Sequence, residues 1–366
     1  MKRIYLAFVL TGVATTMLGP LIPAFEARWH LDDASAGLLF VAEFLSSVAL
    51  AALAPALGRA IGFRSAVALG YSIVAAGVAA CTLGSWPLVI AGVAIYGSGL
   101  GIVVTGSNLA IAAASGGRAS ARPLLWLNMC WSIGAVAAPW LVVGLHAAFL
   151  PVTAAALLAL SAAVGIGGAN PRFGPARHPR AADIPHWSFA TVLFLYVGAE
   201  TAVSGWVSTY ATRGAEERLW AVLPSVFWFA ILAGRALSPG ILIRIPSRTL
   251  APAGLALALT GACTLLAATG ASAMLLGTFL AGLGFAPIYP VVVAEYADLS
   301  RGSVSGLVFS AAGFGGAAIP PLVGAVSTAT HSLRLGLATA ILCIPIIVAV
   351  HARTSTTHPG LLTPGP

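Results

Sequence analysis

The sequence predicts an all-α integral membrane protein, with twelve transmembrane helices in two pseudo-symmetric bundles of six. The first observation is composition: 59% of the 366 residues are hydrophobic and only 8% are charged. A soluble domain carries about 25% charged residues, so this chain could not cover itself with a wettable surface. The second observation is a series of apolar runs of membrane-spanning length, and the third is a set of motifs that recurs between the two halves.

The apolar runs have the roughly 18 to 25 residues that a helix needs to cross a hydrocarbon core about 30 Å thick. Helices are expected because lipid cannot satisfy open backbone groups, and the period-two alternation of barrel strands is absent. The twelve runs begin near Ile4, Ser35, Ala66, Leu88, Arg122, Ala148, Ser188, Leu219, Thr249, Ser272, Val304 and Leu333.

The first run has an alternative interpretation as a secretory signal, because two basic residues precede it and small residues, Ala24 and Ala27, follow. The apolar stretch from Ile4 to Phe25 is too long for a signal core, and eleven further spans follow it. We therefore interpret it as the first transmembrane helix.

The net charge of +8 sets the orientation of the chain. If the N-terminus is cytoplasmic, thirteen of the eighteen basic residues lie on the cytoplasmic side, as the positive-inside rule requires. These thirteen are Lys2, Arg3, Arg59, Arg64, Arg118, Arg122, Arg172, Arg177, Arg180, Arg244, Arg248, Arg301 and Arg353. We expect both termini in the cytoplasm, no nucleic-acid partner, and, since all but one of the basic residues are arginine, a bacterial plasma membrane.

Several function classes lack support in the sequence. Cys81, Cys130, Cys263 and Cys343 occur singly in separate spans, so neither a disulfide framework nor a metal site is indicated. The GSGLG stretch at 97–101 lacks the lysine and the preceding strand of a phosphate loop. No catalytic constellation converges in the spans, so we expect neither an enzyme nor a cofactor.

A long polar stretch divides the chain into two halves. We predict an N-terminal bundle over 1–168, a cytoplasmic linker over 169–187, a C-terminal bundle over 188–352 and a cytoplasmic tail over 353–366. Motifs recur across this divide at nearly constant offset, which indicates a duplication. The matches are Gly12 and Gly19 with Gly198 and Gly205, GLG at 99–101 with GLG at 282–284, and GAVAAP at 134–139 with GGAAIP at 315–320.

The chain resembles the major facilitator superfamily over all twelve spans, and within it the fucose-permease-like branch of sugar permeases. The resemblance implies alternating access by rocking of the two bundles around a central cavity. The stretches that carry it are GLGIVVTGSN (99–108), LNMCWSIGAVAAP (127–139), LYVGAETAVSGW (195–206), AGRAL (233–237) and GLGFAPIYP (282–290).

The chain departs from that family pattern in two places. The loop after the second span, PALGRAIGFR (55–64), has Arg59 where the family usually has an acid, but it keeps Gly62 and Arg64. These three residues are candidates for a gating loop. Sugar permeases of the branch carry acids on the first and fourth spans, where this chain has threonines and Asn108, so coupling at those positions does not carry over.

Two glutamates lie inside spans, Glu43 on the second and Glu200 on the seventh. An ionisable residue there costs roughly 2.5 to 3.5 kcal/mol, so it tends to face a cavity or a partner. Tyr196, Ser204 and Ser208 follow Glu200 at four-residue steps and make one helix face polar. A carboxyl group that gains and loses water could couple transport to a proton gradient. The alternative is a protonated helix-to-helix hydrogen bond.

Two amides and two indoles complete the candidate binding residues. Asn108 and Asn128 offer donors and acceptors suited to hydroxyl-rich or amide ligands, while Trp131 and Trp206 could stack on a ring. Polar contacts between helices are an equally weighted alternative.

A second charged group lies near the predicted cytoplasmic ends of the eighth and tenth spans. Arg235, Glu295, Asp298 and Arg301 could form a gating ion-pair network there. Compensation of helix-end charge is the simpler alternative.

The function predicted from these observations is secondary active transport of a small organic solute, sugar-like in one version, with proton coupling. Proton-driven efflux of drugs or metabolites is the alternative, because the spans offer few charges and several aromatic residues. The expected partners are the solute, protons and the lipid bilayer, and we expect a monomer.

Overall fold

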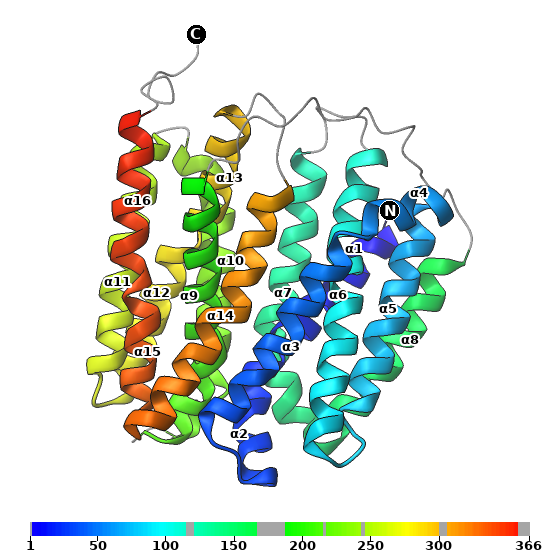
Figure 1. Cartoon of the computed structure of the whole chain (residues 1–366), viewed down its shortest axis with the longest axis horizontal. Coiled ribbons are helices and arrows are strands. Elements are labelled where there is room, and N and C mark those ends of the chain that lie inside the picture. The colour runs from blue at the N-terminus through cyan, green and yellow to red at the C-terminus, as the bar shows by residue number, and fades with distance from the viewer. Residues whose placement is uncertain are drawn as a thin grey trace. The chain divides into compact units, whose positions relative to one another are not determined.

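The computed structural model describes residues 2–114, 121–166, 187–214, 217–242, 246–299 and 306–357, and all regular structure in these ranges is helical (Figure 1). The helices are α1 (Lys2–Thr16), α2 (Leu18–Trp29), α3 (Asp33–Ala51), α4 (Ala54–Ile61), α5 (Phe63–Ala80), α6 (Trp86–Ala114), α7 (Ala121–Leu145), α8 (Phe149–Gly165), α9 (Trp187–Thr212), α10 (Val222–Leu242), α11 (Ser247–Ala267), α12 (Ala271–Phe285), α13 (Ile288–Leu299), α14 (Gly306–Thr330), α15 (Leu333–Ile341) and α16 (Cys343–Thr357), with 3-10 turns η2 (His146–Ala148) and η3 (Glu217–Leu219).

The described helices supply the twelve predicted crossings. Ten apolar helical stretches are long enough to span a membrane, and the shorter apolar stretch Val222–Leu237 adds another. One of the ten, Pro123–Gly165, has 43 residues and would measure about 65 Å as one helix, twice what a bilayer needs. It contains two helices, α7 and α8, so the all-α membrane fold with twelve spans is confirmed.

Three of the spans are interrupted by proline in the same way. Pro20, Pro55 and Pro345 have no N–H to donate to the carbonyl four residues earlier. The residues at those positions are Thr16, Ala51 and Ile341, and they are the last helical residues of α1, α3 and α15. Each helix therefore ends where a proline withholds a backbone hydrogen bond, and a second helix begins within three residues.

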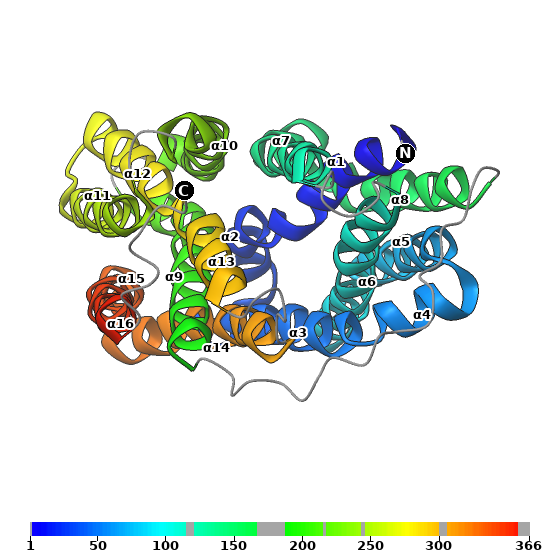
Figure 2. The same cartoon turned by 90° about the horizontal axis from the view of Figure 1, so that it is seen from above.

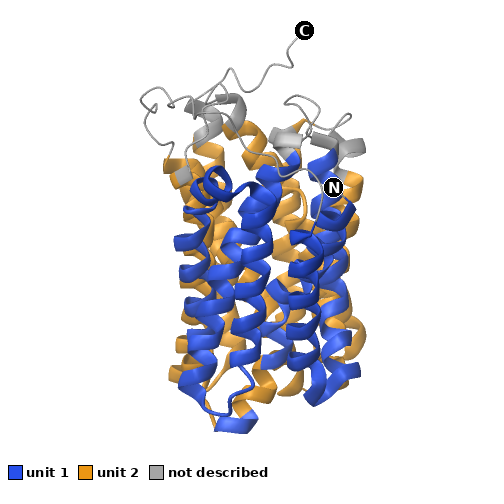
Figure 3. Cartoon of the chain, turned by 90° about the vertical axis from the view of Figure 1, so that its right-hand side faces the viewer, with its two compact units in different colours: residues 1–21, 27–29, 38–177 blue, residues 22–26, 30–37, 178–366 orange. Residues whose placement is uncertain are grey.

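The chain forms two compact units (Figure 3). Unit 1 comprises residues 1–21, 27–29 and 38–177, and unit 2 comprises 22–26, 30–37 and 178–366. Two short segments from the first half of the sequence thus belong to the second unit. Almost all of the predicted linker 169–187 and the end of the tail 353–366 lie outside the described residues, so those boundaries stay predictions.

The duplication appears as the same glycine contact in each unit. Helices α5 and α6 lie side by side in unit 1, as do α11 and α12 in unit 2 (Figure 2). A Cβ on Gly92 would lie 2.8 Å from the Gly77 carbonyl oxygen, and one on Gly277 would lie 2.8 Å from that of Gly261. Close backbone approach through small residues is how helices associate without a hydrophobic drive in lipid. The pairs are offset by 184 and 185 residues, so one packing arrangement occurs twice.

These contacts correct one predicted match, that of GLG at 99–101 with GLG at 282–284. A Cβ on Gly99 would lie 2.7 Å from a carbonyl oxygen of α5, and one on Gly284 would lie 2.5 Å from a carbonyl oxygen of α11. Gly99 therefore corresponds to Gly284, at an offset of 185 rather than 183. The sequence match slipped by two residues because glycine also occupies position 97.

Candidate functional site

The candidate site in unit 2 is built around Glu200 on α9. Its side chain is 10% exposed, and the hydroxyl of Tyr196, one turn earlier, donates to Glu200 Oε1 at 2.6 Å. The spacing of four residues puts both groups on one helix face. Glu200 Oε2 has no hydrogen bond within the described residues and is not among their fully buried unpartnered oxygens. Some surface of this second oxygen is therefore accessible.

Arg235 on α10 pairs with the same carboxyl group. Its Nη2 lies 3.5 Å from Glu200 Oε1, and its side chain is 21% exposed. Sequence analysis puts Arg235 near a helix end, but seven helical residues follow it in α10. Removing one partner of a buried ion pair costs about 3 to 5 kcal/mol. The pair is therefore tightly interdependent even though the contact is longer than a hydrogen bond.

Aromatic rings from three helices surround this pair. The Tyr196 ring packs edge-on against Phe285 at a centroid distance of 5.8 Å and lies 6.2 Å from the Tyr289 ring. Tyr289 on α13 faces both Arg235 and Glu200. The rings exclude water from much of the site, which strengthens the electrostatic interaction between the two charges.

The ion pair has no counterpart in the other repeat. The offset of 186 that relates Gly12 to Gly198 takes Glu200 to Ala14. The offset of 184 that relates the two glycine-packed helices takes Arg235 to Ala51. Both positions hold alanine in unit 1. The scaffold is duplicated but the charges are not, so the pair is not a requirement of the fold.

Glu43, the other acid inside a span, lies in unit 1 and has different surroundings. Its side chain is 3% exposed and it lies beside Tyr96, which is fully buried. No ion pair to Glu43 occurs among the described residues. A Cβ on Gly97 would lie 2.5 Å from the Glu43 carbonyl oxygen, so this part of α3 is packed tightly on α6. Glu43 thus lies in a helix interface.

The two candidate amides lie on α6 and α7 of unit 1. Asn108 Nδ2 donates to the carbonyl of Val104 at 2.8 Å, and Asn128 Nδ2 donates to that of Leu124 at 2.9 Å. Each amide therefore uses one N–H on its own helix and keeps its side-chain oxygen for another donor. Asn128 is exposed, and an exposed amide within a span is more stable against water or a ligand than against lipid.

The two candidate indoles differ in their environment. Trp131 on α7 is half-buried, and its Nε1 donates to Thr15 Oγ1 at 3.3 Å. Trp206 on α9 is 0% exposed, and its Nε1 donates to the Pro320 carbonyl at 2.9 Å. Trp206 has no free ring face for a ligand, so in this structure it packs α9 against α14. The polar face of α9 is likewise closed at Ser208, which is fully buried.

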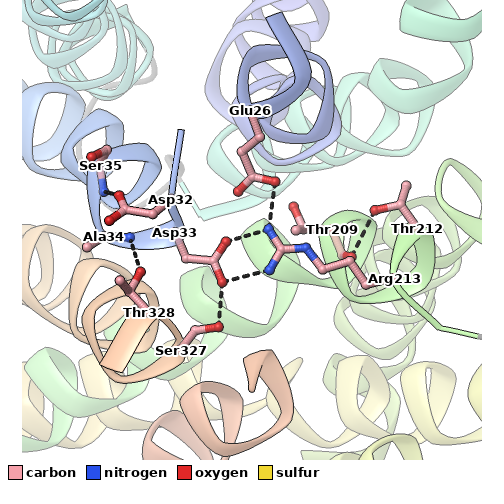
Figure 4. Close-up of polar contacts among 10 residues, drawn as sticks. All are labelled: Glu26, Asp32, Asp33, Ala34, Ser35, Thr209, Thr212, Arg213, Ser327 and Thr328. Atoms are coloured by element: carbon pink, nitrogen blue, oxygen red, sulfur yellow. Dashed lines mark hydrogen bonds and ion pairs between the residues drawn. The ribbon is translucent and has the colours of Figure 1, made fainter. Parts of the chain in front are cut away.

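A second charged cluster, missed by sequence analysis as a cluster, lies at the end of α9 (Figure 4). Arg213 Nη1 donates to Asp33 Oδ2 at 2.8 Å, and Arg213 Nη2 donates both to Asp33 Oδ1 and, at 2.9 Å, to Glu26 Oε2. The Ser327 hydroxyl of α14 donates to Asp33 Oδ2. Asp33 is only 4% exposed, so its charge depends on these donors. We call Glu26, Asp33, Arg213 and Ser327 the Asp33 cluster; all four lie in unit 2.

The backbone around Asp33 is docked on one face of α14. Ala34 N donates to Thr328 Oγ1 at 3.0 Å, and a Cβ on Gly37 would lie 2.9 Å from the Cα of Pro321. Asp32 caps α3 because its Oδ1 accepts from Ser35 N at 2.8 Å. Hydrogen bonds from the hydroxyl and the backbone N–H of Ser35 lower the pKa of Asp32.

The candidate gating loop lies in unit 1 and is anchored to α8. Gly62 has φ +85°, a conformation that favours glycine, between α4 and α5. Arg64 Nε donates to the Val164 carbonyl at 2.5 Å, close to where α8 ends. Arginine at a helix C-terminus satisfies free carbonyls and the helix dipole. Arg59 is exposed. Arg64 therefore stabilises a helix end, and a gating role for this loop stays a prediction.

The predicted charge network around Arg235 is arranged differently. Glu295 Oε2 on α13 lies 2.9 Å from His351 Nε2 on α16, while the side chains of Asp298 and Arg301 lie outside the described residues. His351 was missed because a lone histidine near the end of the last span carries no spacing signal. Within the described ranges, no group of three or more His, Cys, Asp or Glu residues could hold a metal ion.

Comparison with known proteins gives a consistent set of similarities. The sequence profile of the family described as the Major Facilitator Superfamily matches residues 4–320. The glucose/mannose transporter GlcP of Bacillus subtilis is 29% identical over 184 residues, which are 46% of this chain and 43% of GlcP. The uncharacterised transporter YycB of the same organism is 31% identical over 110 residues, 28% of this chain and 27% of YycB. The chain matches less than half the length of these relatives.

Solved structures resemble the chain along nearly its whole length. A bacterial homologue of the human lysosomal transporter Spinster superposes with a TM-score of 0.78 at 14% identity, covering 98% of this chain and 97% of the homologue. The E. coli fucose:proton symporter FucP superposes with a TM-score of 0.66 at 20% identity, covering 95% of this chain and 97% of FucP. At these identities the likeness establishes the fold.

Proposed function

Because this chain belongs to the Major Facilitator Superfamily and is a membrane solute transporter, we propose that it is a proton-coupled secondary transporter of a small organic solute. The observation that carries the proposal is Glu200, a carboxyl group buried inside a span beside Arg235 and Tyr196. Ionisable groups within spans mark solute pathways and proton relays. Glu200 would take up the coupling proton, and alternating access would expose it to each side in turn.

Glu200 can change its protonation state without dismantling the site. When it is ionised, Arg235 and the Tyr196 hydroxyl compensate its charge. When it binds a proton, the accessible Oε2 can carry that proton while Oε1 still accepts from Tyr196. A carrier needs such a group, stable in both states and linked to a neighbour that responds.

The amide oxygens of Asn108 and Asn128 and the half-buried Trp131 support a hydroxyl-bearing solute. The names of GlcP and FucP, a glucose/mannose transporter and a fucose:proton symporter, favour a sugar-like solute and a proton as the coupling ion. We propose a bacterial plasma-membrane location with both termini in the cytoplasm, as the distribution of lysine and arginine predicts.

Solute-driven proton uptake in proteoliposomes tests this function. Wild type, Glu200→Gln and Glu295→Gln are compared across sugars, sugar acids and lipophilic amines, with a pH-sensitive dye inside the vesicles. Glu295→Gln is the matched control, because it also replaces an acid of unit 2 but lies near the end of α13.

We expect solute-driven proton uptake in wild type and in Glu295→Gln and none in Glu200→Gln. Net proton movement driven by amines alone would instead favour efflux of lipophilic compounds. Proton-coupled accumulation that persists in Glu200→Gln at the wild-type rate would exclude Glu200 as the coupling group.

A further inference from the structure

The ion pair of Glu200 and Arg235 also restricts the chemistry of the solute. Arg235 has five N–H donors, and its only ion pair within the described residues is the 3.5 Å contact to Glu200. None of its nitrogens is a fully buried unpartnered atom, and the side chain is 21% exposed. Since exposure of a charge to lipid is costly, the open part of the guanidinium faces water or a ligand.

Protonation of Glu200 would change the charge of the site. In the ionised state Glu200 and Arg235 sum to zero, but a proton on Glu200 leaves a positive guanidinium without compensation in a largely dry environment. A neutral sugar could not remove this imbalance. A solute with one negative charge would remove it, because the solute takes the place that the Glu200 carboxylate has beside Arg235.

We propose that Arg235 is the binding site for the carboxylate of the transported solute, and that this solute is a small hydroxylated organic anion that enters together with one proton on Glu200. This inference rests on the proposed function and specifies its substrate class. The proton passes from water to Glu200 Oε2, the solute carboxylate binds the guanidinium, and the net charge of the site stays zero.

The geometry favours a carboxylate over a phosphate group. A planar guanidinium binds either group through paired N–H donors. A phosphate monoester carries about −1.5 to −2 charges at pH 7, more than one guanidinium compensates once Glu200 is neutral. A carboxylate carries one charge. Arg235 lies as deep as Glu200, 13 residues from the start of α10 against 12 from the end of α9, so the anion would bind mid-span.

The groups that face Glu200 leave it as the proton acceptor. Tyr196 comes from its own helix, Arg235 from α10 and Tyr289 from α13. Arginine stays protonated, and tyrosine loses its proton only far above neutral pH. The proton that accompanies the anion is therefore assigned to Glu200.

Charge movement and solute preference test the proposal together. Purified wild type is reconstituted into vesicles, and uptake of labelled gluconate, glucuronate and glucose is measured with a proton gradient, with and without a potassium–valinomycin potential. Variants are Arg235→Gln, Arg235→Lys and the double Glu200→Gln/Arg235→Gln. Arg334→Gln, an exposed arginine on α15, is the matched control.

We expect proton-driven uptake of a sugar acid that does not respond to membrane potential, since an anion and a proton move together without net charge. Arg235→Gln should lower this uptake at least 100-fold, Arg235→Lys should weaken it about 10-fold through loss of the planar fork, and Arg334→Gln should leave it unchanged. The double variant leaves no charge of the pair buried, so it controls for misfolding. It should be folded by size exclusion and circular dichroism but should transport no anion.

Potential-driven proton uptake with glucose, and none with either sugar acid, would overturn the anion site while leaving the proposed function intact. Sugar-acid uptake that is equal in wild type and Arg235→Gln would also overturn it. Solute uptake without any proton movement would instead contradict the proposed function.

Discussion

Replacing Asp33 by asparagine should loosen the attachment of the segment 30–37 to α9 and α14. Asp33 is 4% exposed and accepts two hydrogen bonds from Arg213 and one from Ser327. Hydrogen bonds to a charged group contribute roughly 1.5 to 3 kcal/mol each. Arg213 is 44% exposed and keeps Glu26 as a partner, so part of the loss is recovered. We expect about 2 to 3 kcal/mol in favour of the detached segment, which is about a 30- to 150-fold change in its equilibrium constant.

Thiol labelling measures this equilibrium directly. Ala34→Cys, in a background without the native cysteines, places a half-buried thiol next to the backbone group that bonds to Thr328. Where labelling is slow relative to reattachment, its rate follows the fraction of detached segment. Asp32→Asn is the matched control, because asparagine caps a helix as well as aspartate does. Equal labelling rates with and without the Asp33→Asn replacement would show that the Asp33 cluster does not hold this segment.

Three further outcomes follow from individual contacts. Asp32→Ala should lower stability by about 1 kcal/mol in thermal unfolding at pH 7. Because the pKa of Asp32 is lowered in the folded state, this contribution is present above the usual value of about 3.9 and is lost as pH falls through the lower folded-state pKa; a difference that grew on acidification would contradict the cap. A Cβ at position 134 would overlap the carbonyl oxygen of Val9, so Gly134→Ala should lower stability by about 1 to 3 kcal/mol, whereas Gly144→Ala, with no atom within 4 Å, should not. His351→Ala should cost about 1 to 3 kcal/mol by leaving its carboxylate partner on α13 unpaired, and His351→Gln should recover part of it if the hydrogen bond matters.

The sequence predicted the architecture well because its signals are local or repeated. Span length follows from apolar runs, and the duplication follows from glycines such as Gly77 and Gly261 that recur at nearly constant offset. Helix breaks inside spans were not predicted, although the prolines that cause them are visible. A proline within an apolar run can be accommodated as a kink or can end the helix, and neighbouring helices decide between the two.

The site was only partly predictable, because its residues come from separate helices. Glu200 was found from its burial cost, but its pairing with Arg235 was missed. Both residues lie 12 to 13 positions from the turn that joins α9 to α10, and this equal depth could have indicated the pair. The contact of Asp33 with Arg213 joins residues 180 positions apart and carries no comparable signal. Trp206 was a candidate for ligand stacking because aromatic residues serve that role and packing equally well, and only its burial separates the two.

The central claim is that Glu200 binds a proton during transport, and infrared difference spectroscopy tests it most directly. Spectra of the purified protein are recorded between alkaline and acidic pH for wild type and for Glu200→Gln, with Glu43→Gln as a second acid inside a span. The account predicts a protonated-carboxyl band that appears on acidification in wild type and in Glu43→Gln and is missing in Glu200→Gln. An unchanged band in Glu200→Gln would contradict the claim that Glu200 carries the proton.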